Sequence, residues 1–497
     1  MYMKTFSMCC KDTRLWLLGL ALWLSACSAP SPRVEMPSMV VSYGLHIKNA
    51  RIVDGTGRRA YTGSVLVGAD TLAYVGPSLP EGYRSDAEVD AGGRVVAPGF
   101  IDAHAHGDPF KTPGFENFRA MGVTTILLGM DGSSPSVEDP TAYMAALDTL
   151  PLGVDVKMMV GHGRLRAVFG ADTLAMQAAI RAHLAAGFIG LSTGIEYYPG
   201  FLSTPEELAA IARPIADAGA VISSHVRSED DDQIEAAIDE LIAQGASSGA
   251  AVHVSHLKMV YGNDLGAADA LLAKLEGAGV TADVYPYTAS YTGIGIVFPE
   301  WALGPGNFEQ ARQTRREELA RYLRERVARR NGPEATLLGT GPWEGRTLAE
   351  VADALGMPFE DVLIDIIGPT GTSAAYFVMN DAVMRRLLQH PLTVVSSDGS
   401  PTMHHPRGYG SFARVIEEFV VRDEMLSLEE AVHKMTGRTA EIFGLTDRGI
   451  LTVGKRADVV LFDPTAVRAH ATFSDPHQRA TGFDGVWVAG VLRTVSP

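Results

Sequence analysis

The sequence predicts an α/β protein made of a (β/α)₈ barrel and a small β-sandwich domain, with the sandwich formed by both ends of the chain. The main observation is that apolar, strand-like segments alternate with amphipathic helical segments between residues 98 and 447, with a repeat of about 30 residues. Both flanking regions instead show short alternating segments broken by Gly and Asp. The 497 residues are also enough for a large barrel and an additional domain.

Eight strands can be counted in the middle of the chain, which predicts a TIM-like barrel. The clearest repeat is the strand-like segment Val221–His225, followed by a helical stripe that ends at Gly245. A helical insertion of about residues 305–390 precedes the last strand. A doubly wound open sheet is the alternative, although no glycine-rich nucleotide-binding sequence follows the first strand. The expected strands are residues 98–103, 123–129, 155–160, 188–192, 220–225, 251–256, 280–285 and 392–397.

The two ends of the chain show the same pattern of short, strand-like segments. The segments Gly63–Val67 near the start and Ala457–Phe462 near the end are both typical of short strands. We therefore expect residues 43–97 and 448–497 to combine into one β-sandwich, and residues 98–447 to form the barrel.

The composition excludes several classes of protein. Hydrophobic residues make up 46% and charged residues 20% of the chain, which is typical of a globular protein and not of a disordered one. The net charge of −16 argues against a nucleic-acid partner. The three cysteines are too few for a disulfide scaffold.

The first residues are typical of an export signal. A mostly basic beginning precedes the apolar run Leu15–Leu24, which at about 10 residues is too short to span a bilayer. The run leads into Ser25-Ala26-Cys27, which resembles a bacterial lipoprotein cleavage site. The resemblance implies that residues 1–26 are a lipoprotein signal peptide and that Cys27 carries the lipid. An ordinary signal peptide is the alternative.

A lipidated Cys27 has two consequences. The protein would be anchored to a bacterial membrane, and Ser28 after the cysteine resembles lipoproteins of the outer membrane, facing the periplasm. Residues 27–42, rich in Ser, Pro and Met, would be the tether. Since no free thiol would remain in the mature chain, any metal site must use His, Asp or Glu.

Histidine and aspartate side chains, which can bind metal ions, lie at the carboxyl ends of several expected strands. The carboxyl ends of barrel strands form the active-site face, so these side chains should converge. Alternation along the chain places His104 and His106 on the same side. Imidazole and carboxylate groups together suit Zn²⁺ or a similar divalent ion. The predicted metal ligands are His104, His106, Asp131, His225, His256 and Asp398.

Several motifs resemble the amidohydrolase superfamily, and most closely its N-acyl-D-amino-acid deacylase (D-aminoacylase) family. The resemblance covers nearly the whole mature chain. The motifs are Ile52-Val53-Asp54-Gly55-Thr56-Gly57, Ala97-Pro98-Gly99-Phe100-Ile101-Asp102-Ala103-His104-Ala105-His106, Gly190-Leu191-Ser192-Thr193-Gly194, Ser255-His256-Leu257-Lys258, Tyr285-Pro286-Tyr287-Thr288-Ala289, Ser397-Asp398-Gly399 and His405-Pro406-Arg407-Gly408-Tyr409-Gly410.

The resemblance also implies roles for the metal ligands. His104 and His106 would hold one metal position, and His225 and His256 the other, while Asp398 would be the catalytic general base and a further ligand. The expected cofactor is Zn²⁺, as one or two ions, with Co²⁺ or Mn²⁺ as alternatives.

Two features depart from the family pattern. Many superfamily members have a modified lysine after the fourth strand, where this chain has Ser192-Thr193-Gly194. The D-aminoacylases have a cysteine ligand after the second strand, where this chain has Asp131. Glu196 is an alternative oxygen ligand, and Asp131 could simply cap the Gly129–Gly132 turn.

The expected substrate is a small molecule with a free carboxylate, which requires fixed positive charge. Lys258 and Arg407 match the family's carboxylate-binding positions, and Tyr197 and Tyr287 match its tyrosines. The acidic run Glu229–Asp232 reads as a solvated helix start.

The sequence therefore predicts metal-dependent hydrolysis of the amide bond of N-acyl-D-amino acids, or of related D-configured dipeptides, to a carboxylate and a free D-amino acid. The alternatives are a dipeptidase or cyclic-amide hydrolase of the dihydroorotase or hydantoinase type, and a metal-binding lipoprotein without activity.

Overall fold

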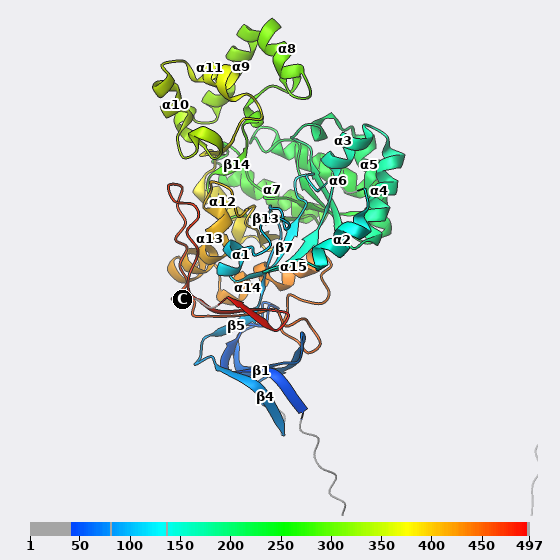
Figure 1. The fold of residues 1–497 in the computed structure, drawn as a ribbon, viewed down its shortest axis with the longest axis vertical. Helices are drawn as coiled ribbons and strands as arrows, with labels where there is room; N and C mark the ends of the chain where they lie inside the picture. Colours follow the sequence, from blue (N-terminus) through cyan, green and yellow to red (C-terminus); the bar gives the residue numbers. More distant parts are fainter. Residues whose placement is uncertain (1–40, 80–81, 136–137, 495–497) are drawn as a thin grey trace, which may run out of the picture. The chain divides into compact units, whose positions relative to one another are not determined.

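The computed structural model describes residues 41–79, 82–135 and 138–494 (Figure 1). The expected signal peptide, Cys27 and most of the tether lie outside the described residues. Within the described part of the chain, no helix is both long enough and apolar enough to cross a membrane.

Both ends of the chain contribute to one eight-stranded sheet. In it, β18 pairs antiparallel with β5, which joins the two ends of the chain directly. The core beneath the sheet contains Ile47, Val65, Val459 and Trp487. The strand order is β20-β19-β18-β5-β1-β2-β3, with β4 paired to β1. The strands are β1 (Val41–Ile52), β2 (Tyr61–Val67), β3 (Leu72–Gly76), β4 (Tyr83–Asp90), β5 (Val95–Pro98), β18 (Val459–Phe462), β19 (Phe483–Val488) and β20 (Val491–Thr494).

The middle of the chain forms a closed parallel barrel, as predicted. β6, β7 and β8 pair in order, and β9 to β13 continue to β17. The barrel closes where the chain after β17 meets the chain after β6: Asp398 N donates to His104 O (2.8 Å) and His106 N to Gly399 O (2.7 Å). The strands are β6 (Phe100–Asp102), β7 (Val123–Leu128), β8 (Asp155–Met158) with β9 (Val160–Gly161), β10 (Gly190–Gly194), β11 (Val221–His225), β12 (Ala251–Val254), β13 (Thr281–Val284) and β17 (Thr393–Val395).

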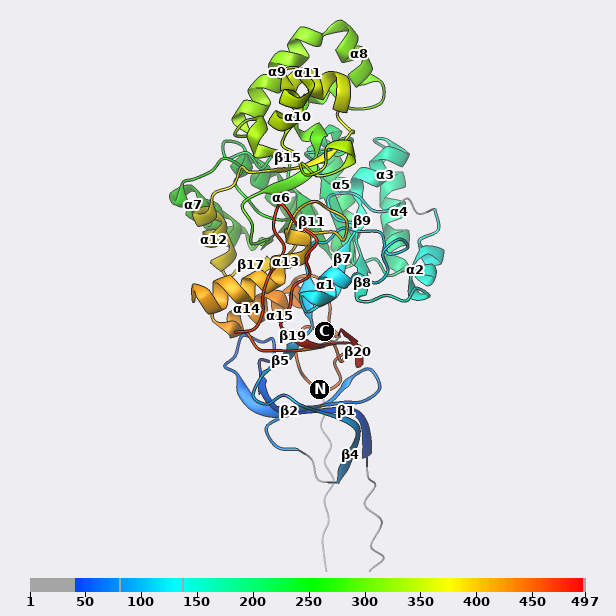
Figure 2. The same cartoon turned by 60° about the vertical axis from the view of Figure 1, so that its left-hand side comes forward.

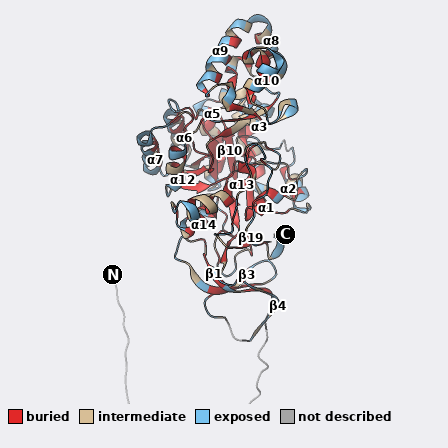
Figure 3. Ribbon diagram, turned by 90° about the vertical axis from the view of Figure 1, so that its left-hand side faces the viewer, coloured by how far each residue is buried: buried red, intermediate tan, exposed pale blue. Residues whose placement is uncertain are grey.

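Each of the eight expected strands overlaps an observed one, because buried parallel strands are uniformly apolar and easily recognised. Figure 3 shows these strands as the buried centre of the barrel. Helices follow them, with ends set by local capping. Asp172, for example, caps α4 by accepting from Leu174 N and Ala175 N. The helices are α1 (Glu116–Ala120), α2 (Pro140–Asp148), α3 (His162–Phe169), α4 (Thr173–Ala185), α5 (Pro205–Asp217), α6 (Ile234–Ser248), α7 (Leu265–Ala278), α12 (Asp381–Gln389), α13 (Arg407–Arg414), α14 (Leu428–Met435) and α15 (Gly437–Ile442).

The insertion before the last strand differs from the prediction. It contains a three-stranded antiparallel sheet in the order β14-β16-β15 as well as helices, and it has its own core around Leu323 and Val351. It begins at β14, and α12 belongs to the barrel because it packs against β13 and β17. Its helices lie together in Figure 2. The elements are β14 (Ser290–Gly293), α8 (Asn307–Thr314), α9 (Arg316–Arg329), β15 (Thr336–Leu338), α10 (Leu348–Leu355), α11 (Phe359–Asp361) and β16 (Ser373–Tyr376).

Candidate metal centre and active site

The backbone leaves ordinary helix and strand geometry at three site residues. Asp131, His256 and Asp398 follow β7, β12 and β17, and their φ angles are 53°, 35° and 47°. Side-chain-bearing residues rarely adopt this left-handed conformation, which persists only where the surrounding structure enforces it. All three residues belong to groups of side chains that could hold a metal ion.

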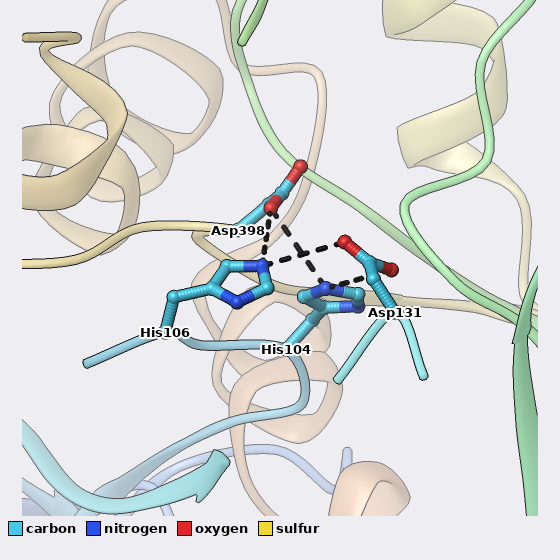
Figure 4. A group of neighbouring side chains, drawn as sticks. All are labelled: His104, His106, Asp131 and Asp398. Atoms are coloured by element: carbon cyan, nitrogen blue, oxygen red, sulfur yellow. Dashed lines mark hydrogen bonds and ion pairs between the residues drawn. The ribbon is translucent and has the colours of Figure 1, made fainter. Parts of the chain in front are cut away.

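The first group of possible ligands contains His104, His106, Asp131 and Asp398 (Figure 4). His106 Nε2 lies 3.1 Å from Asp398 Oδ1 and 3.5 Å from Asp131 Oδ2. His104 Nε2 lies 3.4 Å from Asp131 Oδ1 and 3.8 Å from Asp398 Oδ1. Two imidazoles and two carboxylates thus face a common point.

The second group contains Asp131, His225 and His256. Asp131 Oδ1 lies 3.1 Å from His256 Nε2 and 3.7 Å from His225 Nδ1. The same carboxylate therefore faces both groups. The turn that contains Asp131 is closed by a backbone hydrogen bond, in which Ser133 N donates to Met130 O (2.9 Å). The Asp131 carboxylate itself forms its hydrogen bonds and ion pairs, within the described residues, with histidines.

A second layer of buried carboxylates holds these loops in place. Asp102 accepts hydrogen bonds from His104 N and from Ser397 N, and so ties the end of β6 to the end of β17. Asp283 accepts from His256 N (3.0 Å) and lies 3.0 Å from His253 Nε2. His253, which is not one of the predicted ligands, thus helps to position His256, which is.

The site favours ionised carboxylates. Burial alone would raise the pKa of Asp131, but the adjacent His104 and His256 outweigh it and hold that pKa well below its ordinary value. Burial opposes ionisation of Asp398 too, but Arg407 and His256 lower its pKa far below the usual range. Burial lowers the pKa of His104, so this imidazole is neutral and available as a ligand.

The side chains fit a divalent metal ion. His104 is fully buried, yet neither of its ring nitrogens has a hydrogen-bond partner among the described residues. A buried polar group without a partner is costly unless something else binds it. The nitrogen and oxygen atoms of each group lie within 4.8 Å of one another, and imidazole with carboxylate is a donor set typical of zinc and similar ions.

Glu229 departs from its predicted role. It is buried rather than solvated, and its carboxylate contacts Lys258 Nζ and lies 3.1 Å from His256 Nδ1. Asp230 is also buried and accepts from Arg326 Nη1 (2.6 Å). Local sequence does not reveal this burial, because the cations that pair with these acids, Lys258 and Arg326, come from other parts of the chain.

The predicted substrate-binding residues are only partly assembled. Lys258, Arg407 and Tyr197 line one cavity, whereas Tyr287 is not among its lining residues. The Tyr287 hydroxyl donates weakly to Pro406 O (3.5 Å). Tyr285 is not a lining residue either, but it is the tyrosine of this motif that packs against both cations: the Arg407 guanidinium carbon lies 4.7 Å and Lys258 Nζ 5.6 Å from its ring centre.

The two predicted cations are already paired with acids. Arg407 Nη1 lies 2.9 Å from Asp398 Oδ2, and Lys258 binds Glu229. Tyr197 OH accepts from Thr292 Oγ1 (3.2 Å) and lies 3.4 Å from His225 Nδ1. The cavity volume is about 680 Å³, enough for a small ligand, and part of its wall comes from the insertion.

Comparisons with known proteins agree with this architecture. The model of the amidohydrolase family matches residues 173–493. N-acyl-D-glutamate deacylase of Alcaligenes xylosoxydans xylosoxydans is 33% identical over 484 residues, which cover 90% of this chain and 92% of that protein. D-aminoacylase of the same organism is 32% identical over 494 residues, covering 90% and 94%.

A solved structure is similar over almost the same range. It is N-acyl-D-glutamate deacylase from Bordetella bronchiseptica, complexed with zinc and a phosphonate inhibitor that mimics the tetrahedral intermediate. Its TM-score is 0.79 at 31% identity, and the match covers 91% of this chain and 96% of that one.

The fold and the site define a barrel hydrolase of C–N bonds with ligands for divalent metal ions. The chain belongs to the amidohydrolase family, and its similar relatives include deacylases of N-acyl-D-amino acids.

Proposed function

We propose that this protein hydrolyses the amide bond of N-acyl-D-amino acids to a carboxylic acid and a free D-amino acid. The observation that carries the proposal is the convergence of histidines and carboxylates on a cavity that also contains Arg407 and Lys258. Sequence similarity supports the proposal as well, because relatives named as deacylases of D-amino-acid derivatives align with about nine-tenths of the chain.

In this proposal, the metal is held by His104, His106, Asp131, His225, His256 and Asp398. A divalent ion there supplies Lewis-acid chemistry, which acidifies water and polarises a carbonyl group. We favour Zn²⁺, as one or two ions, with Co²⁺ or Mn²⁺ as alternatives. Asp131 is preferred over Glu196 as the oxygen ligand because its carboxylate faces both groups of histidines. Glu196 belongs to a third possible group, with His225 and Glu229, and its Oε2 lies 2.8 Å from His225 Nε2.

Asp398 is the proposed general base. It accepts the proton of the attacking water and then donates it to the nitrogen of the leaving amine. Arg407, 2.9 Å from Asp398 Oδ2, keeps this carboxylate ionised and oriented. Arg407 Nη2 already donates to Tyr291 O (3.2 Å), but Arg407 Nε has no hydrogen-bond partner among the described residues. Arg407 Nε and the Tyr197 hydroxyl would bind the α-carboxylate of the substrate, and Lys258 adds positive charge nearby.

The test is a set of paired N-acetyl-D- and N-acetyl-L-amino acids, assayed with the purified protein after metal removal and after addition of Zn²⁺, Co²⁺ or Mn²⁺. Release of the free D-amino acid only after metal addition is the expected result. The Asp398→Asn protein, loaded with the same metal, is the matched control. Hydrolysis of the L-series alone, or metal-independent hydrolysis, would contradict the proposal.

We further propose that the protein is lipidated at Cys27 and faces the periplasm from a bacterial outer membrane. The support is the sequence around the cysteine, a short apolar run ending in Leu24-Ser25-Ala26-Cys27.

A further inference from the structure

One buried cation in the wall of the cavity has no acidic partner among the described residues. Four Lys or Arg side chains line the cavity, and two of them, Lys258 and Arg407, are paired with acids. Arg164 is exposed to solvent. The fourth, Arg330, is only 3% exposed and forms no ion pair with any described residue. Buried charges are normally paired, so an unpaired one in a cavity wall points to an anionic ligand.

The polar atoms around Arg330 are also unsatisfied. Its Nε and Nη1 are buried without hydrogen-bond partners in the described chain, and so are Ser290 Oγ and Tyr376 OH. These groups adjoin one another: Ser290 and Tyr376 are direct partners across β14 and β16, and the Arg330 guanidinium carbon lies 4.7 Å from the Tyr376 ring centre. Water could satisfy the two hydroxyls, but it could not neutralise the guanidinium.

This cluster belongs to the insertion and not to the barrel. Arg330 follows α9, while Ser290 and Tyr376 lie on β14 and β16. The α-carboxylate of the substrate must stay within a few bonds of the scissile amide, and Arg407 is the cation in direct contact with the metal-site residue Asp398. Within the described residues, no hydrogen bond or ion pair joins Arg330 to a residue of the metal groups. It therefore suits an anionic group on a more distant part of the substrate.

Resting on the proposed function, we propose that Arg330, with Ser290 and Tyr376, binds a second carboxylate of the substrate. The preferred substrates are then dicarboxylic N-acyl-D-amino acids. The second acid group can belong to the amino-acid side chain or to the acyl group, since both would present the same carboxylate to the guanidinium.

The experiment compares matched acidic and neutral substrates with the metal-loaded enzyme. One pair is N-acetyl-D-glutamate and N-acetyl-D-glutamine, and the other is N-succinyl-D-leucine and N-succinamoyl-D-leucine. In the wild type, kcat/KM for the acidic member of at least one pair should exceed that for the neutral member by ~10²-fold. The pair that shows the preference identifies the source of the carboxylate.

Substitutions then assign the preference to the cluster. Arg330→Gln should abolish the preference, chiefly by raising KM for the acidic substrate, and should change kcat/KM for the neutral one by less than about threefold. Arg330→Lys should restore part of the preference, and the milder Ser290→Ala should reduce it. Arg329→Gln is the matched control, because Arg329 is adjacent in sequence but half-exposed and bound to Asp232.

Three results would overturn the inference. The first is a wild type that hydrolyses neutral N-acyl-D-amino acids as well as acidic ones, which would leave the proposed function intact. The second is an equal fall in kcat/KM for acidic and neutral substrates in Arg330→Gln, which would indicate that Arg330 binds the α-carboxylate. The third is failure to hydrolyse any N-acyl-D-amino acid, which would remove the proposed function as well.

Discussion

Replacing Asp131 with Asn tests how the metal is bound. Asn removes the negative charge but tolerates the left-handed backbone, at φ 53°, almost as well as Asp does. A residue that only shaped the turn could therefore be replaced with little effect. A metal ligand could not, because the amide is a far weaker donor than the carboxylate.

The size of the effect follows from the position of the carboxylate. Asp131 Oδ1 and Oδ2 together lie 3.1–3.7 Å from the nitrogens of four histidines, so one substitution weakens both ligand groups. Changes outside the ligand shell of a metal typically reduce affinity 10- to 100-fold. We expect Asp131→Asn to reduce metal affinity by at least the upper end of this range, ~100-fold, which corresponds to about 2.7 kcal/mol of binding free energy.

The assay is competition with a chelator of known affinity, followed by measurement of the bound metal. Glu196→Gln is the matched control, because Glu196 pairs with only one metal-site histidine, His225. This substitution should reduce the affinity for the metal by no more than about tenfold. Asp131→Cys should shift the preference from Co²⁺ and Mn²⁺ toward Zn²⁺, since a thiolate is a softer ligand. Wild-type affinity in Asp131→Asn together with a large loss in Glu196→Gln would refute the assignment.

Four other predictions concern separate parts of the molecule. Asp398→Asn should retain most of its metal but lose at least ~10²-fold in kcat, and near-wild-type turnover would exclude it as the base. Arg407→Ala should raise KM for substrates with an α-carboxylate and also lower kcat, since it orients Asp398; an unchanged KM would remove it from the binding site. Burial lowers the pKa of Lys434 to about 7, so the unfolded chain binds more protons between pH 7 and its ordinary pKa of 10.5. From pH 7 to 9 the wild type should therefore gain stability relative to Lys434→Met in urea unfolding, by at most about 1.4 kcal/mol per pH unit, and parallel curves would contradict this. Cys27→Ser should lose fatty-acid label in growing cells, and equal labelling of both proteins would disprove lipidation there.

The barrel and the positions of its potential metal ligands could be predicted because their signals are local. A buried parallel strand is a short apolar run, and the residue after it lies on the active-site face whatever surrounds it. His104, His106, His225 and His256 follow directly from counting strands. Asp131 and Asp398 follow in the same way, and they lie beside these histidines.

The insertion was less predictable. Its three strands have three or four residues each, and they pair across long stretches of chain. No local sequence pattern therefore predicts this sheet. The side-chain partners were harder still. Tyr285 and Tyr287 are two residues apart in one motif, and only the packing of α13 decides which of them meets Arg407.

By itself, the sequence determined the fold class, the order of the strands and the residues able to bind metal, because each depends on neighbouring residues and on the two-residue period of a strand. Only the tertiary structure decided which charges are paired. Glu229 is buried against Lys258, and Arg330 is buried without an ion pair to any described residue. The cost of a buried charge depends on the groups that distant segments bring within a few ångströms, and the order of residues along the chain does not contain those distances.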